Sequence, residues 1–297
     1  MKKRFIYVAF VDFQKAFDSI DRNVLYEILH NNGLSGHLYS AIVSIYSCVK
    51  AYVREGGLCS NILYCTKGLR QGCKLSPILF ALYINELHDV MTSKNVRGIQ
   101  LFPDYTELFL LMFADDLGFI SDTIGGLQNQ LNILQTFGET HKLVVNIEKT
   151  KVVVFKNGGT LSRHEKWYFG GKQLDVVDGF SYVGVYFSNR LSLYKMAEAT
   201  ALKAKRVLNY IFASFKEFSY VPINTFFKVF DSKISTLLLY GSELWGLRHM
   251  HCIENLHIQA CKRLVNVNKS SSNDAVMSDL GRCPFHINAS KRCIRFW

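Results

Sequence analysis

The feature that most constrains the fold of this chain is a pair of adjacent aspartates inside an apolar stretch, residues 108–121, LFLLMFADDLGFIS. An apolar run ends just before Asp115 and Asp116, and apolar residues resume directly after them. A helix would bury a carboxylate on a largely apolar cylinder, whereas two short strands joined by a tight turn would hold both at an exposed tip. We therefore expect a hairpin with the two aspartates at its turn.

Two neighbouring carboxylates repel each other, so this arrangement is costly unless a cation lies between them. Oxygen ligands with no His or Cys nearby favour magnesium over zinc or copper. The alternative is an ordinary polar turn, because aspartate is a favoured turn residue. The motifs in the rest of the chain distinguish between these two interpretations.

The distribution of charge along the chain suits an anionic partner. Residues 1–148 carry 13 basic and 14 acidic side chains, whereas residues 149–297 carry 22 basic and 10 acidic ones. A half that could hold cations, followed by a strongly basic half, is typical of proteins that bind a polyanion such as nucleic acid. A basic surface kept for solubility explains the charge alone equally well.

The cysteines and the N-terminal stretch indicate an intracellular protein. The 8 cysteines lack the paired short spacings of a disulfide framework, and the His and Cys residues between 249 and 261 have no recognised zinc spacing. The apolar residues after the basic start meet Asp12 and lack a small-residue cleavage site, so we expect a strand there and not a signal peptide. No stretch approaches the ~20 apolar residues of a membrane span.

The chain in order alternates strands and helices up to about residue 190 and is helical beyond it. A buried strand is expected at 5–13, with Asp12 near its end, and a helix capped by Ser19 or Asp21 follows and stops at Gly33. The spacing predicts a second helix at 37–49 and a hairpin within 51–65. After a loop with Arg70, Gln71 and Gly72, the pair Ser76-Pro77 predicts a capped helix start.

Further elements follow the aspartate hairpin. An amphipathic helix is expected around 127–137, short strands at 143–146 and 152–155, a hairpin within 167–176 and a single aromatic strand at 180–187. Four helical stripes follow, at 196–215, 223–240, 253–267 and 286–297, with basic residues interspersed. We expect a small helical domain with a basic face.

The order of these pieces resembles the palm domain of reverse transcriptases, most closely those of non-LTR (LINE-type) retrotransposons. The similarity covers nearly the whole chain: DFQKAFD (12–18) is similar to motif A, residues 68–77 to motif B, FADD (113–116) to motif C, 143–151 to motif D and 180–184 to the primer-grip motif E. The downstream YGSELWG (240–246) is also similar to the non-LTR type.

The resemblance implies a fold class and a domain layout. It implies an α+β polymerase palm, an antiparallel sheet with packed helices, over residues 1–190. A mostly helical, thumb-like domain and the start of a C-terminal region would then occupy residues 191–297.

The resemblance also implies RNA-directed DNA polymerase activity, by two-metal transfer of dNTPs onto a primer 3′-hydroxyl. Asp12, Asp115 and Asp116 would hold two Mg²⁺ ions, with Mn²⁺ as a substitute, and Asp116 would be the weaker or structural contributor. Lys149 matches a motif D lysine that would act as a general acid for pyrophosphate. The partners implied are an RNA template, a DNA primer or target DNA, and dNTPs, in a nuclear or cytoplasmic ribonucleoprotein.

Substrate contacts are implied for two further sets of residues. Phe17 matches the family's steric gate, a ring that would clash with a ribose 2′-hydroxyl. An RNA-dependent RNA polymerase would more often have a polar, acidic residue there. Contacts with the nascent base pair and the nucleotide are implied for Gln71, Gly72 and Arg70. The primer grip is implied to consist of Phe180, Tyr182 and Gly184.

The chain also departs from the family pattern. Lys74 and Lys142 stand where the family usually has proline and glycine. Because the chain opens at motif A, we expect the fingers and endonuclease regions of a parent protein to be missing, and the 297 residues alone to be weak or inactive. The alternatives are a non-catalytic truncated copy that keeps the palm fold and binds RNA, and a group II intron maturase, which RQGCKLSP (70–77) and YGSELWG disfavour.

Overall fold

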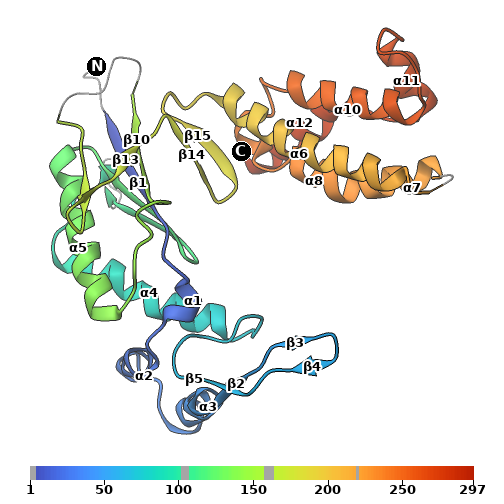
Figure 1. The fold of residues 1–297 in the computed structure, drawn as a ribbon. Helices are drawn as coiled ribbons and strands as arrows, with labels where there is room; N and C mark the ends of the chain where they lie inside the picture. The colour runs from blue at the N-terminus through green and yellow to red at the C-terminus, as the bar shows by residue number, and fades with distance from the viewer. Residues whose placement is uncertain (1–4, 102–106, 157–163, 219–220) are drawn as a thin grey trace. The chain divides into compact units, whose positions relative to one another are not determined.

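The computed structural model describes residues 5–101, 107–156, 164–218 and 221–297. The chain forms two compact units, Met1–Asp178 and Gly179–Trp297, each with its own hydrophobic core (Figure 1). The division falls before the predicted boundary at 190/191 because the hairpin of β14 (Gly179–Tyr182) and β15 (Val185–Ser188) packs on α6 (Leu193–Phe215). The α+β palm and the helical domain expected from the sequence are both present.

A five-stranded sheet is the centre of the first unit. Its order is β13 (Asp175–Val176), β10 (Lys151–Phe155), β1 (Ile6–Val11), β9 (Asp116–Ser121), β8 (Leu110–Phe113). β1 pairs antiparallel with both β9 and β10, and β13 pairs parallel with β10. The first strand of the chain is therefore the central strand, although its partners lie more than a hundred residues away in sequence.

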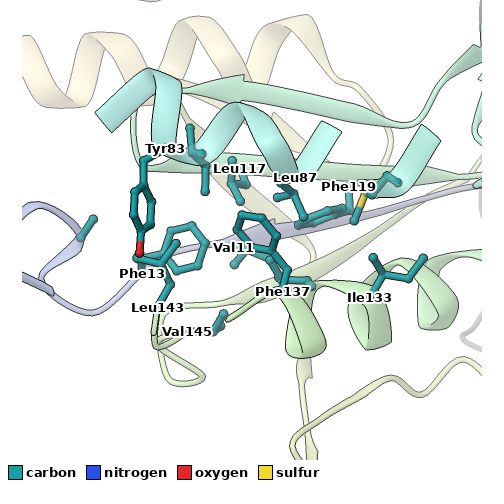
Figure 2. Packing of buried hydrophobic residues seen from close by; sticks show 14 of the residues in the cluster. Val11, Phe13, Tyr83, Leu87, Leu117, Phe119, Ile133, Phe137, Leu143 and Val145 are labelled. Atoms are coloured by element: carbon teal, nitrogen blue, oxygen red, sulfur yellow. The ribbon is translucent and has the colours of Figure 1, made fainter. Parts of the chain in front are cut away.

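The helices α4 (Ser76–Ser93) and α5 (Ile124–His141) pack against one face of this sheet (Figure 2). Side chains alternate along a strand, so Val11 and its same-face neighbours join the helix residues in one core. Val8 and Phe10 point to the opposite face and are buried as well. This confirms the prediction that the first strand is buried on both faces.

Smaller elements complete the first unit. Asp21 caps α2, as one of the two predicted candidates, by accepting hydrogen bonds from the amides of Asn23 and Val24 at 2.9 and 3.3 Å. The remaining helices and strands are α1 (Ala16–Ser19), α2 (Arg22–Asn31), α3 (Gly36–Ser47), β2 (Val49–Ala51), β3 (Arg54–Glu55), β4 (Leu58–Cys59), β5 (Leu63–Cys65), β6 (Ile99–Gln100), β7 (Glu107–Leu108), β11 (Tyr168–Phe169) and β12 (Lys172–Gln173).

Three local predictions were wrong. Ser76 is the first residue of α4 but does not cap it, because its hydroxyl donates to the Arg70 carbonyl at 2.6 Å. Residues 143–146 form no strand, and only Val145 makes an isolated bridge, to Phe13. The segment 180–187 is not one strand but the β14–β15 hairpin, which turns at Val183 and Gly184.

The second unit is mostly helical. Its large apolar side chains, among them Phe226, Phe230 and Trp245, form one buried cluster. After α6 its elements are α7 (Ile223–Val229), a π-helical segment η1 (Phe230–Ser235), α8 (Thr236–Leu238), α9 (Ser242–Trp245), α10 (His251–Leu264), α11 (Asn273–Asp279) and α12 (Phe285–Phe296). The sequence pattern missed the short helices α9 and α11 and the π-helical turn.

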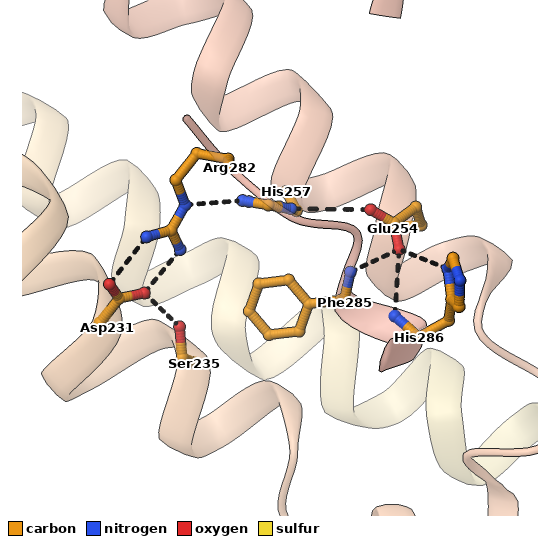
Figure 3. Close-up of polar contacts among 7 residues, drawn as sticks. All are labelled: Asp231, Ser235, Glu254, His257, Arg282, Phe285 and His286. Carbon is orange, nitrogen blue, oxygen red and sulfur yellow. Dashed lines mark hydrogen bonds and ion pairs between the residues drawn. The ribbon is translucent and has the colours of Figure 1, made fainter. Parts of the chain in front are cut away.

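A polar network ties the ends of these helices together (Figure 3). Arg282 donates to both carboxylate oxygens of Asp231 in η1, at 2.8 and 2.6 Å, and to Nε2 of the buried His257 in α10 at 3.4 Å. Glu254 accepts from the amide of Phe285 at the start of α12, at 2.8 Å. The hydrogen bond from Arg282 holds the pKa of Asp231 below its usual range.

No helix among the described residues combines the length and the apolar character needed to cross a membrane.

Candidate active site

The two aspartates lie at the turn of a β-hairpin, as the sequence predicts. β8 and β9 pair in a register that sets Phe113 opposite Asp116, which leaves Ala114 and Asp115 as the two turn residues. Ala114 has a φ of 53°, in the left-handed region. Tight hairpin turns that match the twist of the strands need a positive φ at their first central residue. A non-glycine residue there costs of order 1 kcal/mol, so the turn is held in a strained conformation.

The sheet register brings Asp12 to this turn. β1 and β9 pair with Val11 opposite Leu117, so Asp12, the next residue, comes opposite Asp116. Side chains of directly opposed residues lie on one face, with Cβ atoms roughly 5 Å apart. By alternation this is the sheet face opposite α4 and α5. Asp12 and the turn of Asp115 and Asp116, which are distant in sequence, therefore lie near each other at the same end of the sheet.

The pKa of Asp116 records this proximity. The partial burial of its carboxyl raises the pKa above its ordinary value, and the negative charges of Asp115 and Asp12 raise it further. The ionised form of Asp116 is thus disfavoured by its neighbours, the situation that a bound cation relieves.

Lys149 lies beside Asp12. Its Nζ is 3.4 Å from Asp12 Oδ2, and its side chain is 69% exposed. Lys149 lies in a turn in which its amide donates to Asn146 Oδ1 at 3.3 Å, while the Asn146 amide donates to the Asp12 carbonyl at 2.7 Å. The motif D turn is therefore attached directly to the backbone of the motif A strand end.

The oxygen donors suit a hard divalent cation. Asp12 Oδ2 is buried and has no hydrogen-bond partner within the described part of the chain, and its contact with Lys149 is an ion pair without hydrogen-bond geometry. Over the same residues, no three His, Cys, Asp or Glu side chains converge closely enough to hold a metal ion as they stand. The chemistry of the three acids fits magnesium, whose ligands are carboxylates together with substrate phosphates and water.

Phe17 contacts α4 through its ring and the motif B loop through its backbone. Phe17, half-buried in α1, stacks on Phe80 of α4 with 4.7 Å between ring centroids, and its carbonyl accepts from the Leu69 amide at 2.8 Å. Gly68 has a φ of 81°, and a Cβ there would lie 2.7 Å from the Asp18 carbonyl oxygen. Glycine is therefore required for the loop to approach α1 this closely.

The predicted substrate residues of this loop are exposed. Gln71 donates through its side-chain amide to Asp18 Oδ1 at 3.1 Å, and Gly72 has a φ of 79° with open space around it. Arg70 is exposed, and its carbonyl accepts from Ser76. These side chains are accessible to a ligand.

Arg22 holds this loop, and sequence analysis missed it. Its guanidinium is buried and donates to the carbonyls of Tyr46, Cys65, Lys67 and Gly68 at 2.7–3.1 Å. The signal in the sequence is only one arginine in the first turn of a predicted helix, where a solvated position is the usual expectation. All its acceptors are backbone carbonyls, one in α3 and three within residues 65–68, and side-chain patterns do not report such contacts.

The predicted primer-grip residues lie in the second unit. Phe180 and Tyr182 are half-buried on β14, and Gly184 is in the turn to β15 with a φ of 80°. The YGSELWG segment contacts this turn: the Tyr240 hydroxyl donates to the Val183 carbonyl at 2.7 Å. Lys203 of α6 donates to the Gly184 carbonyl at 2.8 Å. Two elements of the helical unit therefore hold the hairpin turn.

Comparison with known proteins identifies the family. The family model described as reverse transcriptase (RNA-dependent DNA polymerase) matches residues 1–187. The chain belongs to the reverse transcriptase family. Within that family it is 25% identical, over 64% of its length, to the Pol polyprotein of a type-1 R2 retrotransposable element from Popillia japonica. It is 27% identical, over 62% of its length, to the Pol polyprotein of the type-2 R2DM element from Drosophila melanogaster. It is 22% identical, over 88% of its length, to the RNA-directed DNA polymerase of the mobile element jockey from the same species.

The chain spans 32%, 18% and 28% of the lengths of these three relatives. Among solved structures, a telomerase from Candida albicans, determined with a fragment of telomeric RNA, aligns over 94% of this chain and 51% of its own with a TM-score of 0.51. At 12% sequence identity this likeness concerns the fold alone.

Proposed function

We propose that the first unit carries the catalytic centre of an RNA-directed DNA polymerase of the non-LTR retrotransposon type. The observation that carries this proposal is the register that sets Asp12 opposite Asp116 at the turn that contains Asp115, with Lys149 paired to Asp12. The motifs lie in the order of the family, and the relatives from R2 and jockey elements support the same assignment.

Each residue then has a chemical role. Asp12 and Asp115 would hold two Mg²⁺ ions, Mn²⁺ being a substitute, and Asp116 would complete the negative site as the weaker ligand. When bound, such ions lower the pKa of a primer 3′-hydroxyl and neutralise the triphosphate and the leaving pyrophosphate. Lys149 Nζ, which is exposed to solvent beside Asp12, would donate a proton to the pyrophosphate oxygen. Gln71 and Gly72 would face the nascent base pair, and Arg70 would contact the incoming nucleotide.

The nucleic-acid partners follow from this assignment. An RNA strand would serve as template, and a DNA strand with a free 3′-hydroxyl would serve as primer. In the second unit, Phe180, Tyr182 and Gly184 would contact that primer strand.

The experiment that tests the metal assignment replaces Asp115 by Asn, which keeps the shape and removes the charge. Mn²⁺ binding to the 297-residue chain is measured by electron paramagnetic resonance, because binding needs no turnover. We expect the affinity to fall by at least about tenfold, since a carboxylate roughly 4 Å from a divalent ion gains about 2 kcal/mol even at the dielectric constant of water, and about 1.4 kcal/mol is tenfold. Incorporation of dTTP on a poly(A) template with an oligo(dT) primer should fall in parallel wherever it is measurable.

Asp89→Asn is the matched control. Asp89 is an exposed acid on α4, and its substitution by Asn removes the same charge. Unchanged Mn²⁺ binding in a folded Asp115→Asn variant, or an equal loss in the control, would contradict the assignment.

A second prediction concerns sugar selection by Phe17. Truncation of this ring to Ala opens the space beside a ribose 2′-carbon, so we expect the ratio of rUTP to dTTP incorporation to rise by at least about tenfold. The stack with Phe80 is lost at the same time, so Phe80→Leu serves as control for a general loosening of the loop. A selectivity that moves equally in both variants would argue against a steric gate at Phe17.

A further inference from the structure

A pocket of about 710 Å³ lies within the second unit, formed by α6, α10, the segment that follows α10 and the first residue of α11. This volume is typical of a site for a small ligand, for which the usual range is about 300–1,000 Å³. None of the residues assigned above to catalysis or to the primer grip lines it.

The pocket is positively charged. Lys205, Lys262, Arg263 and Lys269 line it, and no Asp or Glu is among its described lining residues. A concave surface lined by one sign of charge focuses the potential and attracts an anion. Four of the basic residues of the second half of the chain are thus gathered in this pocket.

The four cations play different parts. Lys262 is 8% exposed, and its Nζ donates to the carbonyls of Lys269 and Ser271 at 2.7 and 2.6 Å, so it builds the rim of the pocket. Lys205 and Lys269 are exposed. Lys205 and Lys269 can therefore contact a ligand, whereas Lys262 stabilises the backbone at the rim.

Arg263 adds a flat surface. Its guanidinium lies over the ring of Phe212 at 4.1 Å and donates to Asn209 Oδ1 at 3.1 Å. A guanidinium has five N–H donors, so most of them remain for a ligand. A planar cation fixed on one side by an aromatic ring presents its other side as a stacking surface for a base.

Side-chain amides supply the remaining polar groups. Asn209, Asn255, Gln259, Asn266 and Asn273 line the same pocket, and all five are exposed. Amides both donate and accept, as do base edges and the ribose 2′-hydroxyl. An acidic peptide would use the cations but would leave the amides and the stacking surface without matching groups.

We infer that this pocket binds an unpaired segment of RNA. Lys205 and Lys269 contact its phosphates, Arg263 stacks on a base, and the amides bond the sugar and base edges. A duplex keeps its bases paired inward, so a single strand suits the pocket better. The inference deepens the proposed function, since it rests on RNA being the template that this protein handles.

The test measures binding of a short fluorescein-labelled oligo(U) RNA to the full 297-residue chain by fluorescence anisotropy, in EDTA and without dNTPs. The pocket variant is Lys205→Gln with Lys269→Gln, and the matched control is Lys195→Gln with Lys291→Gln, two exposed lysines of the same unit outside the pocket. We expect the pocket variant to bind at least about tenfold more weakly, with a salt slope smaller by roughly 0.7 per lost phosphate contact. The control should keep its affinity within about twofold.

Arg263→Lys separates stacking from charge. The substitution keeps the positive charge but removes the planar guanidinium group. We therefore expect weaker binding of oligo(U) and unchanged binding of inorganic polyphosphate. Circular dichroism of each variant verifies that the helices are intact.

Three results would overturn the inference. These are an equal loss of affinity in the control variant, equal affinity for single-stranded DNA of matching sequence, and competition by polyglutamate as effective as that by RNA. The Asp115→Asn variant keeps the two proposals apart, because it should bind RNA normally. If polymerisation fails while pocket-dependent binding persists, only the proposed function is wrong.

Discussion

At the residue scale, the charges around Asp116 lower the stability of the folded protein. Asp116 has a raised pKa from partial burial and from the charges of Asp115 and Asp12, so its ionised form is disfavoured in the folded state. A group with a raised folded pKa loses stability as the pH rises from the unfolded value through the folded one. At neutral pH without metal the site is therefore destabilised by its own charges.

We predict that Asp116→Asn raises the melting temperature in EDTA. The turn is exposed to solvent, which screens the charges, so the gain should be below about 1 kcal/mol, or at most ~2–4 °C. Differential scanning calorimetry measures the melting temperature of the wild type and the variant, first in EDTA and then with Mn²⁺. Mn²⁺ should raise the melting temperature of the wild type more than that of the variant, and equal shifts would contradict the charge argument.

Asp21 gives a pH prediction of the opposite sign. Its hydrogen bond from Lys142, helped by the amides of Val24 and Asn23, holds the pKa of Asp21 below its ordinary value. A carboxyl with a lowered folded pKa stabilises the protein above the unfolded value of about 3.9, and this stability is lost as the pH falls through the folded value. Lys142 itself has a φ of 54°, a conformation that glycine adopts at lower cost than lysine.

We predict that Asp21→Asn keeps the helix cap but flattens the loss of stability below about pH 4. Asp21→Ala should lose the cap as well and cost about 0.5–2 kcal/mol at pH 7. Urea unfolding of both variants at pH 7 and pH 4 separates the cap from the ion pair. An unaltered acid dependence in Asp21→Asn would show that another carboxyl dominates.

At the scale of elements, local signals predicted most of the first unit. The alternation of apolar and acidic residues was enough for the hairpin of Asp115 and Asp116, since strand period and turn chemistry are encoded locally. Ser76 failed as a cap because a nearby carbonyl, that of Arg70, competes for its hydroxyl. The turn at Val183 and Gly184 was missed because the aromatic residues on both sides read as one strand.

The part of the site that no local pattern could predict is the contact between distant elements. The opposition of Asp12 and Asp116 depends on strand register, and it entered the prediction through the family resemblance. Arg22 had no such support, because its four partners are backbone carbonyls, one in α3 and three within residues 65–68, that come together only in the fold.

We predict that Arg22→Met destabilises the first unit by at least about 3 kcal/mol, because four carbonyls lose a charged donor. Arg22→Lys should recover only part of this, since one ammonium cannot reach all four acceptors of the planar fork. Hydrogen exchange of amides within 65–73, measured by mass spectrometry, should accelerate in both variants. Exchange that changes equally over α5 would indicate global unfolding and not a loosened loop.

At the scale of the whole molecule, two separate cores predict two unfolding transitions. Trp167 is buried in the first unit and Trp245 in the second, whereas Trp297 is 84% exposed. With Trp297→Phe in the background, Trp167→Phe and Trp245→Phe leave one buried reporter each. We expect different urea midpoints for the two reporters, and coincident midpoints would show that the units unfold as one.

The central place of β1 has a consequence for synthesis on the ribosome. Tyr7 pairs with Ser121 and Val154, so both edges of the first strand must wait for residues made much later. At translation rates of roughly 5–20 residues per second, that delay lasts on the order of ten seconds. During this time an apolar segment leaves the exit tunnel with its edges open, which makes it a natural client for nascent-chain chaperones.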